Sequence, residues 1–259
     1  MDLKLNDKVV VISGSSKGIG LGIAETLLTE KCKVVITGRN IDHLKKAEFN
    51  LVNRFGQEAL LAIQSDFRSP TKVKNMINQV TNHFGKIDIL VCNVGSGTSS
   101  SEALPDEDSW ESTFQTNLNS AVYAVRLSLP YLEKRTNSNI IFVSSIAGSE
   151  VIGAPTGYSV AKSAINSLSK NLAIKLGSKG IRVNTISPGN ILFPGGTWEA
   201  KVRDDKQKVQ CMLNEKVPLG RFGNPREIGD VVAFIASDRS SFITGSNFYV
   251  DGGQTISIN

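Results

Sequence analysis

Val9-Val-Val-Ile-Ser-Gly14-Ser-Ser-Lys-Gly18-Ile-Gly20 is the stretch that decides the fold of this chain. It begins with a short β-branched run, which is typical of a strand buried on both faces. A glycine-rich turn follows and leads into residues 21–28, whose apolar side chains have helical spacing. Backbone N–H groups and the helix dipole at such a turn face an anion. The stretch therefore predicts a strand, a phosphate-binding turn and a helix, although an ordinary turn between a strand and a helix could have the same sequence.

Similar apolar segments recur along the 259 residues and alternate with helical patterns. We expect strands at residues 9–12, 34–37, 59–63, 87–92, 140–143, 182–186 and 247–250, and helices that include residues 70–84 and 110–135. Such alternation favours a parallel, doubly wound sheet with right-handed connections. No linker or repeat marks a second domain, and the length fits one α/β domain. The prediction is an α/β fold, a single Rossmann-type domain over residues 1–259 with about seven strands and helices on both faces.

The composition argues against several other classes of protein. The net charge of +5 comes from dispersed residues, without the dense basic blocks of nucleic-acid-binding proteins. The first residues are charged and no run approaches membrane-spanning length, so we expect neither a secretory peptide nor a membrane partner. Cys32, Cys92 and Cys211 are scattered, which favours a reduced, cytoplasmic setting. His43 and His83 lie in polar helical surroundings, so we expect no metal site.

Tyr158 and Lys162 form a candidate proton-transfer pair. Their spacing of four places both side chains on one face of a helix. A phenol with a pKa of about 10 exchanges protons poorly at pH 7, but a nearby ammonium favours the phenolate and lowers that pKa. Ser145 precedes Tyr158 by 13 positions and could hold the same substrate oxygen from a neighbouring strand end. Taken alone, the pair could equally be a half-buried tyrosine and a surface lysine.

These motifs together resemble the short-chain dehydrogenases/reductases. Gly14-x-x-x-Gly18-Ile-Gly20, Asn117, Ser145 and Tyr158-x-x-x-Lys162 occur in the order of that family, and the resemblance extends from about residue 5 to the C-terminus. It implies hydride transfer between a nicotinamide and a carbonyl or secondary alcohol. It also implies a homotetramer joined through the helices near residues 110–135 and 158–178, where Ala161, Ala164 and Ala173 would allow close approach between subunits or between the helix and its own sheet.

The resemblance implies four catalytic residues. Tyr158 would donate the proton during reduction, and Lys162 would lower its pKa and bind the nicotinamide ribose. Ser145 would polarise the carbonyl, and its 13-residue interval to Tyr158 favours it over Ser144. Asn117 would anchor a water that links Lys162 to solvent, unless it only kinks or packs its helix.

The resemblance also implies a set of cofactor-binding positions. Asp66 would contact the adenine, unless it is a turn or helix-capping residue before Pro70, and the backbone of Ile191 would bind the nicotinamide carboxamide. Beside Asn93 and Gly95, this chain has Cys92 and Val94 where the family usually has other residues. The full set is Gly14, Ser16, Lys17, Gly18, Ile19, Gly20, Arg39, Asp66, Phe67, Asn93, Gly95, Tyr158, Lys162, Pro188, Gly189 and Ile191.

The tip of the second strand favours NADP(H) over NAD(H). NAD sites usually offer a carboxylate there, whereas NADP sites place an arginine nearby. This chain has Gly38-Arg39-Asn40, and Lys17 matches a position where NADP-preferring family members often carry a cation. The alternative is a solvated Lys17 and an Arg39 that pairs with an acid such as Asp42.

Residues 190–216 are predicted to form a substrate lid. Gly195-Gly196 would act as its hinge, and Phe193 and Trp198 would close an apolar pocket over the substrate or simply pack the lid onto the domain. Phe193 stands where relatives often have threonine, and Thr197 could supply that hydroxyl. This segment is unlike the commonest family members.

The general pattern is closest to 3-oxoacyl-(acyl carrier protein) reductases, which would make the substrate an acyl thioester and the carrier protein a possible partner. Arg135 and Lys179 lie near positions where those enzymes present cations to the acidic carrier. A sugar, polyol or other ketone is the alternative substrate. A non-catalytic, nucleotide-binding regulator is the alternative of another class, and its mark would be the loss of Tyr158, Lys162 or Ser145.

Overall fold

The computed structural model describes residues 1–100 and 102–257, and its centre is one parallel sheet. The strands are β1 (Val9–Ile12), β2 (Lys33–Gly38), β3 (Leu60–Gln64), β4 (Ile89–Cys92), β5 (Ser138–Val143), β6 (Ile181–Pro188) and β7 (Asn247–Val250). Their order is β3-β2-β1-β4-β5-β6-β7, and every neighbouring pair is parallel. This confirms the predicted fold class, with strand ends that differ from the expected ones by a few residues at most.

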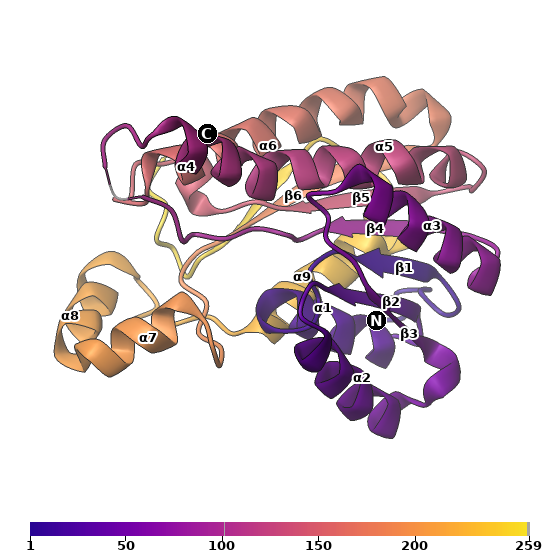
Figure 1. Cartoon of the computed structure of the whole chain (residues 1–259), viewed down its shortest axis with the longest axis horizontal. Coiled ribbons are helices and arrows are strands. Elements are labelled where there is room, and N and C mark those ends of the chain that lie inside the picture. Colours follow the sequence, from indigo (N-terminus) through magenta and orange to yellow (C-terminus); the bar gives the residue numbers. More distant parts are fainter. Residues whose placement is uncertain (101, 258–259) are drawn as a thin grey trace.

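Helices cover both faces of the sheet (Figure 1). They are α1 (Gly18–Thr29), α2 (Ile41–Phe55), α3 (Pro70–Phe84), α4 (Glu107–Phe114), α5 (Ser120–Leu132), α6 (Thr156–Leu176), α7 (Thr197–Asp204), α8 (Lys206–Lys216) and α9 (Pro225–Ala236). Helices α1, α2 and α9 lie on one face, and α3 to α6 lie on the other. Helices α7 and α8 project away from these layers. No helix of the described residues is both long and apolar enough to cross a membrane.

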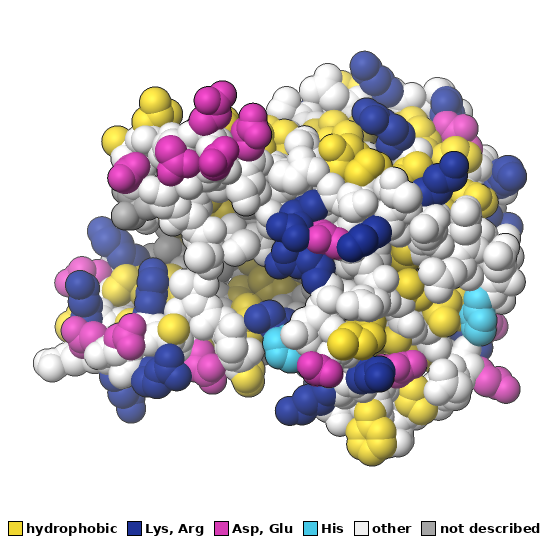
Figure 2. Space-filling view, viewed as in Figure 1, with side chains coloured by type: hydrophobic (Ala, Val, Ile, Leu, Met, Phe, Trp, Pro, Cys, Tyr) yellow, Lys and Arg dark blue, Asp and Glu magenta, His cyan; other side chains and the backbone are white. Residues whose placement is uncertain are grey.

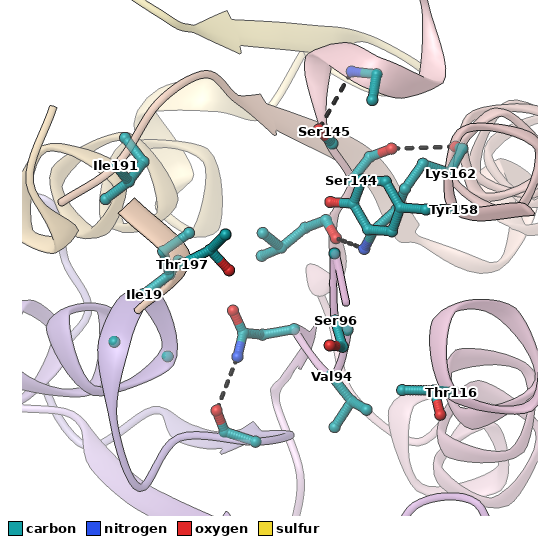
Figure 3. A pocket seen from close by; sticks show the side chains of 18 of the residues that line it. Ile19, Val94, Ser96, Thr116, Ser144, Ser145, Tyr158, Lys162, Ile191 and Thr197 are labelled. Atoms are coloured by element: carbon teal, nitrogen blue, oxygen red, sulfur yellow. Dashed lines mark hydrogen bonds between the residues drawn. The ribbon is translucent and has the colours of Figure 1, made fainter. Parts of the chain in front are cut away.

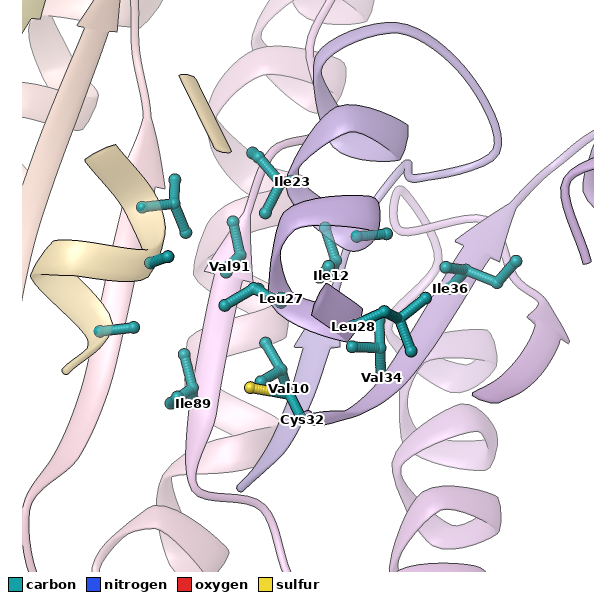
Figure 4. Close-up of a cluster of buried hydrophobic side chains, with 14 of the residues drawn as sticks. Val10, Ile12, Ile23, Leu27, Leu28, Cys32, Val34, Ile36, Ile89 and Val91 are labelled. Atoms are coloured by element: carbon teal, nitrogen blue, oxygen red, sulfur yellow. The ribbon is translucent and has the colours of Figure 1, made fainter. Parts of the chain in front are cut away.

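The two hydrophobic cores follow from the alternation of side chains along the strands. Val10 and Ile12 of β1 point into the core under α1 and α9, which Figure 4 shows from close by. Val9 and Val11 point into the core under α3, α5 and α6. Strand β1 is therefore apolar on both faces, as the β-branched run at residues 9–12 indicates.

Local capping signals explain why α3 occupies the predicted range of 70–84. The Ser69 side chain accepts a hydrogen bond from the Lys72 N–H, and Pro70 fills the first turn, where its missing N–H costs nothing. Gly85 ends the helix in a left-handed conformation with φ of 72°.

The helix predicted over residues 110–135 is present from residue 107 to residue 132, but it is not regular throughout. A π-helical turn at Gln115–Asn119 separates α4 from α5. The Asn117 side chain donates to the Thr113 carbonyl one turn earlier and also bonds the backbone of Ser96, so tertiary contacts pull this turn out of regular α geometry.

Candidate active site

A cleft of about 1710 Å³ runs along the carboxyl ends of the strands. It lies where the strand order reverses, between β1 and β4, which is the position where doubly wound sheets bind ligands. Its volume exceeds the roughly 300–1,000 Å³ of a typical single-ligand pocket, so it has room for a dinucleotide and a second ligand. Figure 2 shows the hollow between the α7–α8 projection and the body, with Lys and Arg side chains beside it.

The glycine turn forms one end of this cleft. Helix α1 begins at Gly18, which has φ of +59°, a conformation that favours glycine. A Cβ on Gly20 would lie 2.5 Å from the Gly14 carbonyl oxygen and 2.6 Å from Nδ2 of Asn93, so only glycine fits there. No described side chain caps the first N–H groups of α1, which leaves these donors available to an anion.

Polar side chains hold the glycine turn in place. Asn93 donates to the carbonyl oxygens of Ser13 and Gly14 at 3.0 and 2.9 Å. The Ser15 hydroxyl accepts from the Thr37 N–H at 2.8 Å, and the Thr37 hydroxyl accepts from the Gly14 N–H at 3.0 Å. Asn93 lines the cleft as predicted, and the structure adds this bracing contact to its expected role.

Lys17 and Arg39 are exposed at the same end of the cleft. The alternative in which Arg39 pairs with Asp42 is wrong, because neither Arg39 nor Lys17 forms an ion pair with any residue that the structure describes. The charge of Arg39 contributes to the lowered pKa of Asp66, but neither cation is held in an ion pair, so the tip of β2 provides a positive site for an anionic group.

Asp66 and Phe67 also lie on the wall of the cleft. Asp66 binds the Arg68 guanidinium through both carboxylate oxygens, which holds the pKa of Asp66 below its usual range. Asp66 does not cap α3, because Ser69 does, but it is a turn residue: its Oδ1 accepts from the Arg68 N–H and its carbonyl accepts from the Ser69 N–H, both at 3.0 Å. Phe67 is 2% exposed and packs in the core, which favours a packing role for its ring.

Tyr158, Ser145 and Lys162 converge on the opposite wall (Figure 3). Tyr158 and Lys162 come from the first turns of α6, whereas Ser145 lies two residues beyond the end of β5. The Nζ atom of Lys162 lies 5.8 Å from the centre of the Tyr158 ring and donates to the Val143 carbonyl at 3.0 Å. The Ser144 hydroxyl donates to the Lys162 carbonyl at 3.1 Å and so holds α6 in place. This contact favours Ser145 over Ser144 as the serine that would polarise the substrate carbonyl.

Burial controls the protonation of this group. It lowers the pKa of Lys162 to about 8, because the ammonium is cut off from water. Burial also raises the pKa of Tyr158, while the neighbouring Ser145 hydroxyl lowers it. The expected lowering of the Tyr158 pKa by Lys162 is therefore not a feature of this arrangement, in which the ammonium bonds a backbone carbonyl.

Asn117 lies behind the cleft wall rather than on it. Its side chain is 2% exposed, and its Oδ1 accepts from the Ser96 N–H at 2.9 Å. A Cβ on Gly95 would lie 2.9 Å from Nζ of Lys162 and 3.0 Å from Oδ1 of Asn117, so Gly95 lets both side chains approach the loop after β4. Asn117 therefore lies next to Lys162, where the predicted water link to Lys162 needs it. It also lies in the π-helical turn, so the alternative role of distorting its helix applies as well.

The segment after β6 completes the cleft. Gly189 and Ile191 line it. Pro188 does not: it is buried as the last residue of β6 and pairs with Val250.

Phe193 lies over the glycine turn and not over the catalytic group. A Cβ on Gly18 would lie 2.7 Å from the Phe193 ring, and the ring packs against the core under α1. Trp198 instead stacks with Phe222 at 5.3 Å and lies under the Lys201 ammonium at 4.5 Å. Both aromatic side chains line the cleft, but their contacts favour the alternative in which they pack the 190–216 segment onto the protein.

Phe193→Ala is expected to weaken the binding of a phosphate-bearing nucleotide at the glycine turn about tenfold, because removal of the ring opens this turn to water. Dissociation constants from titration with dinucleotides would measure the effect. An unchanged nucleotide affinity would show that Phe193 does not shield the turn and would leave it as a candidate substrate contact.

Several cleft residues carry no local sequence signal. Glu150 comes from a loop and Gln254 from the C-terminal tail. Gly38 packs closely on Ser16, because a Cβ on Gly38 would lie 2.7 Å from the Ser16 hydroxyl oxygen. Only the fold brings these segments together, so a pattern search along the chain does not find them.

Arg135 and Lys179 do not flank this cleft. Arg135 pairs with the buried Asp88 at 3.0 Å, and Lys179 pairs with Glu133 at 2.6 Å. Asp88 immediately precedes β4, so these pairs lie at the amino ends of the strands, opposite the cleft. Both cations are therefore held in ion pairs away from the cleft, and their positions give no support for a carrier protein as partner.

Ala161 and Ala173 are 0% and 4% exposed within the chain itself. Their small size lets α6 sit close to its own sheet, which is the second of the two interpretations of this alanine pattern. They carry no argument for a subunit interface.

Comparisons with known proteins agree with this geometry. A family model described as enoyl-(acyl carrier protein) reductase matches residues 14–255. The 3-oxoacyl-[acyl-carrier-protein] reductase of Thermotoga maritima is 30% identical over 98% of this chain and 100% of its own length. The NADP-dependent (R)-specific alcohol dehydrogenase of Lentilactobacillus kefiri is 32% identical over 97% of this chain and 98% of its own.

Among solved structures, L-sorbose reductase from Gluconobacter frateurii, complexed with NADPH and L-sorbose, has a TM-score of 0.93 and 33% identity, with 100% of both chains covered. The family model and these relatives span nearly the whole chain, and the residues that carry the resemblance meet in one cleft. The chain belongs to the short-chain dehydrogenase/reductase family and is an NAD(P)-dependent oxidoreductase.

Proposed function

We propose that this protein reduces a carbonyl group with NADPH. The observation that carries the proposal is the arrangement of one cleft, with Tyr158 and Ser145 on one wall and the glycine turn with Lys17 and Arg39 at the other end. A regulator that only binds a nucleotide would need the glycine turn and its cations, but not Tyr158 and Ser145. The presence of both halves favours catalysis.

The donor groups of the cleft fit an anionic dinucleotide. The first-turn N–H groups of α1 suit a pyrophosphate, while the segment at Gly189 and Ile191 offers backbone groups at the other end. When bound, the nicotinamide supplies the hydride. The protein positions the carbonyl and supplies its proton.

Tyr158 is the proposed proton donor. Because burial raises its pKa, the phenol stays protonated at pH 7 and can protonate the developing alkoxide. Ser145 would hold the carbonyl oxygen by a hydrogen bond. Lys162 would bind the nicotinamide ribose. Asn117, which lies next to Lys162, would anchor the water through which a proton returns from solvent.

The preference for NADPH rests on charge. Lys17 and Arg39 have no acidic partner in the described chain, and no carboxylate follows β2 directly. A 2′-phosphate would give these cations a partner, whereas a 2′-hydroxyl would not.

Arg39→Ala is expected to weaken NADPH binding about tenfold and to leave NADH binding nearly unchanged, because only NADPH carries the phosphate. Arg54→Ala is the matched control, since Arg54 is exposed on α2 and pairs with Glu25. Titration with each nucleotide gives the ratio of the two affinities. Equal losses for NADPH and NADH would rule out the assignment.

Two substrate classes fit the cleft. A 3-oxoacyl thioester is supported by the bacterial relatives and by the exposed apolar side chains of Val151, Ile152 and Ile256 at the cleft rim, which an acyl chain could contact. The positions of Arg135 and Lys179 remove one argument for a carrier protein as partner.

A hydroxylated ketone of the sugar or polyol type is supported by the likeness to L-sorbose reductase and by the polar side chains of Glu150, Asn190 and Gln254 in the same wall. Because these polar side chains can hydrogen-bond hydroxyl groups, a hydroxylated ketone is the stronger of the two candidate substrate classes. Helices α7 and α8 would form the lid over either substrate, and a homotetramer remains the family expectation.

The test is NADPH and NADH oxidation by purified protein with hydroxyketones, ketoses, aldoses and an acetoacetyl thioester. NADPH-dependent turnover of any of them supports carbonyl reduction, and the ranking of rates identifies the class. Tight NADPH binding without turnover of any carbonyl would contradict the proposal and favour a regulator.

A further inference from the structure

The C-terminal tail forms a fixed part of the cleft wall. Asp251 accepts hydrogen bonds from the N–H groups of Gly253 and Thr255 and from the Thr255 hydroxyl, at 2.9, 2.8 and 2.6 Å. One carboxylate oxygen of Glu150 accepts from the N–H groups of Ile256 and Ser257. These two carboxylates secure the backbone on both sides of Gln254. Gln254 is therefore presented to the cleft from a fixed position.

The Gln254 amide lacks a partner. Its Oε1 is buried and accepts no hydrogen bond from any residue that the structure describes. The same atom lies 3.2 Å from the position that a Cβ on Gly189 would occupy, so the amide packs directly on the segment after β6. Buried polar atoms are almost always satisfied, and an unsatisfied one at a cleft wall is poised to bind a ligand. The terminal torsion of glutamine is soft, so the amide can turn toward a ligand without moving the backbone.

Asn190, the residue after Gly189, provides a second amide in the cleft. It lines the cleft, is 8% exposed, and its backbone is fixed by the hydrogen bond from the Gly223 N–H to its carbonyl at 3.0 Å. Its Nδ2 donates only to the sulfur of Met212 at 3.6 Å, which is a weak acceptor. Its Oδ1 accepts no hydrogen bond within the described ranges 1–100 and 102–257. The cleft therefore contains the carboxamides of Gln254 and Asn190, and neither is well satisfied.

These amides line the same cleft as the catalytic group. Strands β5 and β6 are neighbours and are paired up to Val143 and Ile186. Ser145 lies two residues beyond the end of β5, and Gly189 comes directly after β6. Adjacent strands are about 4.8 Å apart, so a ketone held by Ser145 lies beside the segment on which the Gln254 amide packs.

A neutral amide oxygen and an amide N–H together suit a hydroxyl group, which donates and accepts at once. A methylene in the same place would leave the amides unsatisfied, so it would be rejected. We propose that Gln254 and Asn190 recognise a hydroxyl beside the reacting carbonyl, which makes the substrate class the hydroxylated ketones. This inference rests on the proposed carbonyl reductase function and adds its specificity.

The test compares hydroxyacetone with 2-butanone, which differ by a hydroxyl in place of a methyl group. In the wild-type protein, kcat/KM with NADPH should be at least about tenfold higher for hydroxyacetone. Gln254→Met keeps the length of the side chain and removes the amide, so it should lower this preference about tenfold. The preference is a ratio for one protein sample and is therefore insensitive to the fraction that is folded. Gln57→Met is the matched control, because Gln57 is exposed in the turn before β3, away from the cleft.

The outcomes separate the two proposals. Turnover of both ketones without a preference for hydroxyacetone, or a preference that survives in Gln254→Met and in Asn190→Leu, would overturn the inference and leave carbonyl reduction standing. No NADPH oxidation with either ketone, nor with the wider carbonyl panel, would overturn both.

Discussion

Tyr158→Phe is expected to lower kcat/KM for carbonyl reduction by roughly 10²–10⁴-fold, the usual contribution of a positioned acid. The variant loses only the phenol oxygen, so the ring still fills its half-buried place on α6. NADPH affinity should change little, because the phosphate-binding turn and the cations at the tip of β2 are untouched. Steady-state rates together with nucleotide titration measure the two effects separately.

Tyr131→Phe is the matched control. Tyr131 lies near the end of α5, on the side of the amino ends of the strands, and does not line the cleft. If Tyr158→Phe kept a tenth or more of the wild-type rate, the phenol would not be the proton donor. Intact cellular function in that variant would favour the regulator interpretation.

Lys162→Met is expected to abolish most activity and, at the same time, to stabilise the fold. Lys162 is 3% exposed, and its pKa falls from 10.5 to about 8 because burial disfavours the charged form. Below pH 8 the folded protein bears the cost of this buried charge, about 3 kcal/mol for such a shift. Methionine has a similar shape and no charge, so it should raise Tm at pH 7 in the absence of nucleotide.

The pH dependence of this stabilisation has a definite sign. Between pH 8 and 10.5 the unfolded chain binds more protons at this lysine than the folded chain does, so wild-type stability rises with pH in that window. The advantage of Lys162→Met should therefore shrink as pH rises from 8 toward 10. Lys175→Met, on the exposed side of the same helix, should change neither activity nor Tm appreciably. A Lys162→Met protein that is less stable than wild type at pH 7 would contradict the account.

The sequence predicts the parts of this protein that depend on local patterns. The β-branched run before Gly14 and the caps at Ser69 and Gly85 act within a few residues, so the alternation of strands and helices along the chain and the bounds of α3 follow from such signals. The Tyr158–Lys162 spacing likewise needs only a helix. The catalytic and cofactor residues come together in the cleft, except that Pro188 and Asn117 lie behind its wall.

Contacts between distant segments could not be predicted in this way. The π-helical turn at Asn117 depends on the backbone of Ser96, and the position of Phe193 depends on Gly18. Helices α1 and α9 approach closely because Gly22 and Gly229 face each other's helices, with a Cβ on Gly22 only 2.4 Å from Pro225. No periodicity within either segment encodes such a pairing, since it is decided by how the folded layers pack.

The central claim is that hydride passes to a carbonyl that Tyr158 protonates. The most direct measurement uses NADPH that carries deuterium at the transferable position, with hydroxyacetone as substrate and mass spectrometry of the product. The account predicts a diol with one deuterium on the former carbonyl carbon, formed by the wild-type protein and not above background by Tyr158→Phe. A product without deuterium at that carbon, or equal labelling by Tyr158→Phe, would contradict it.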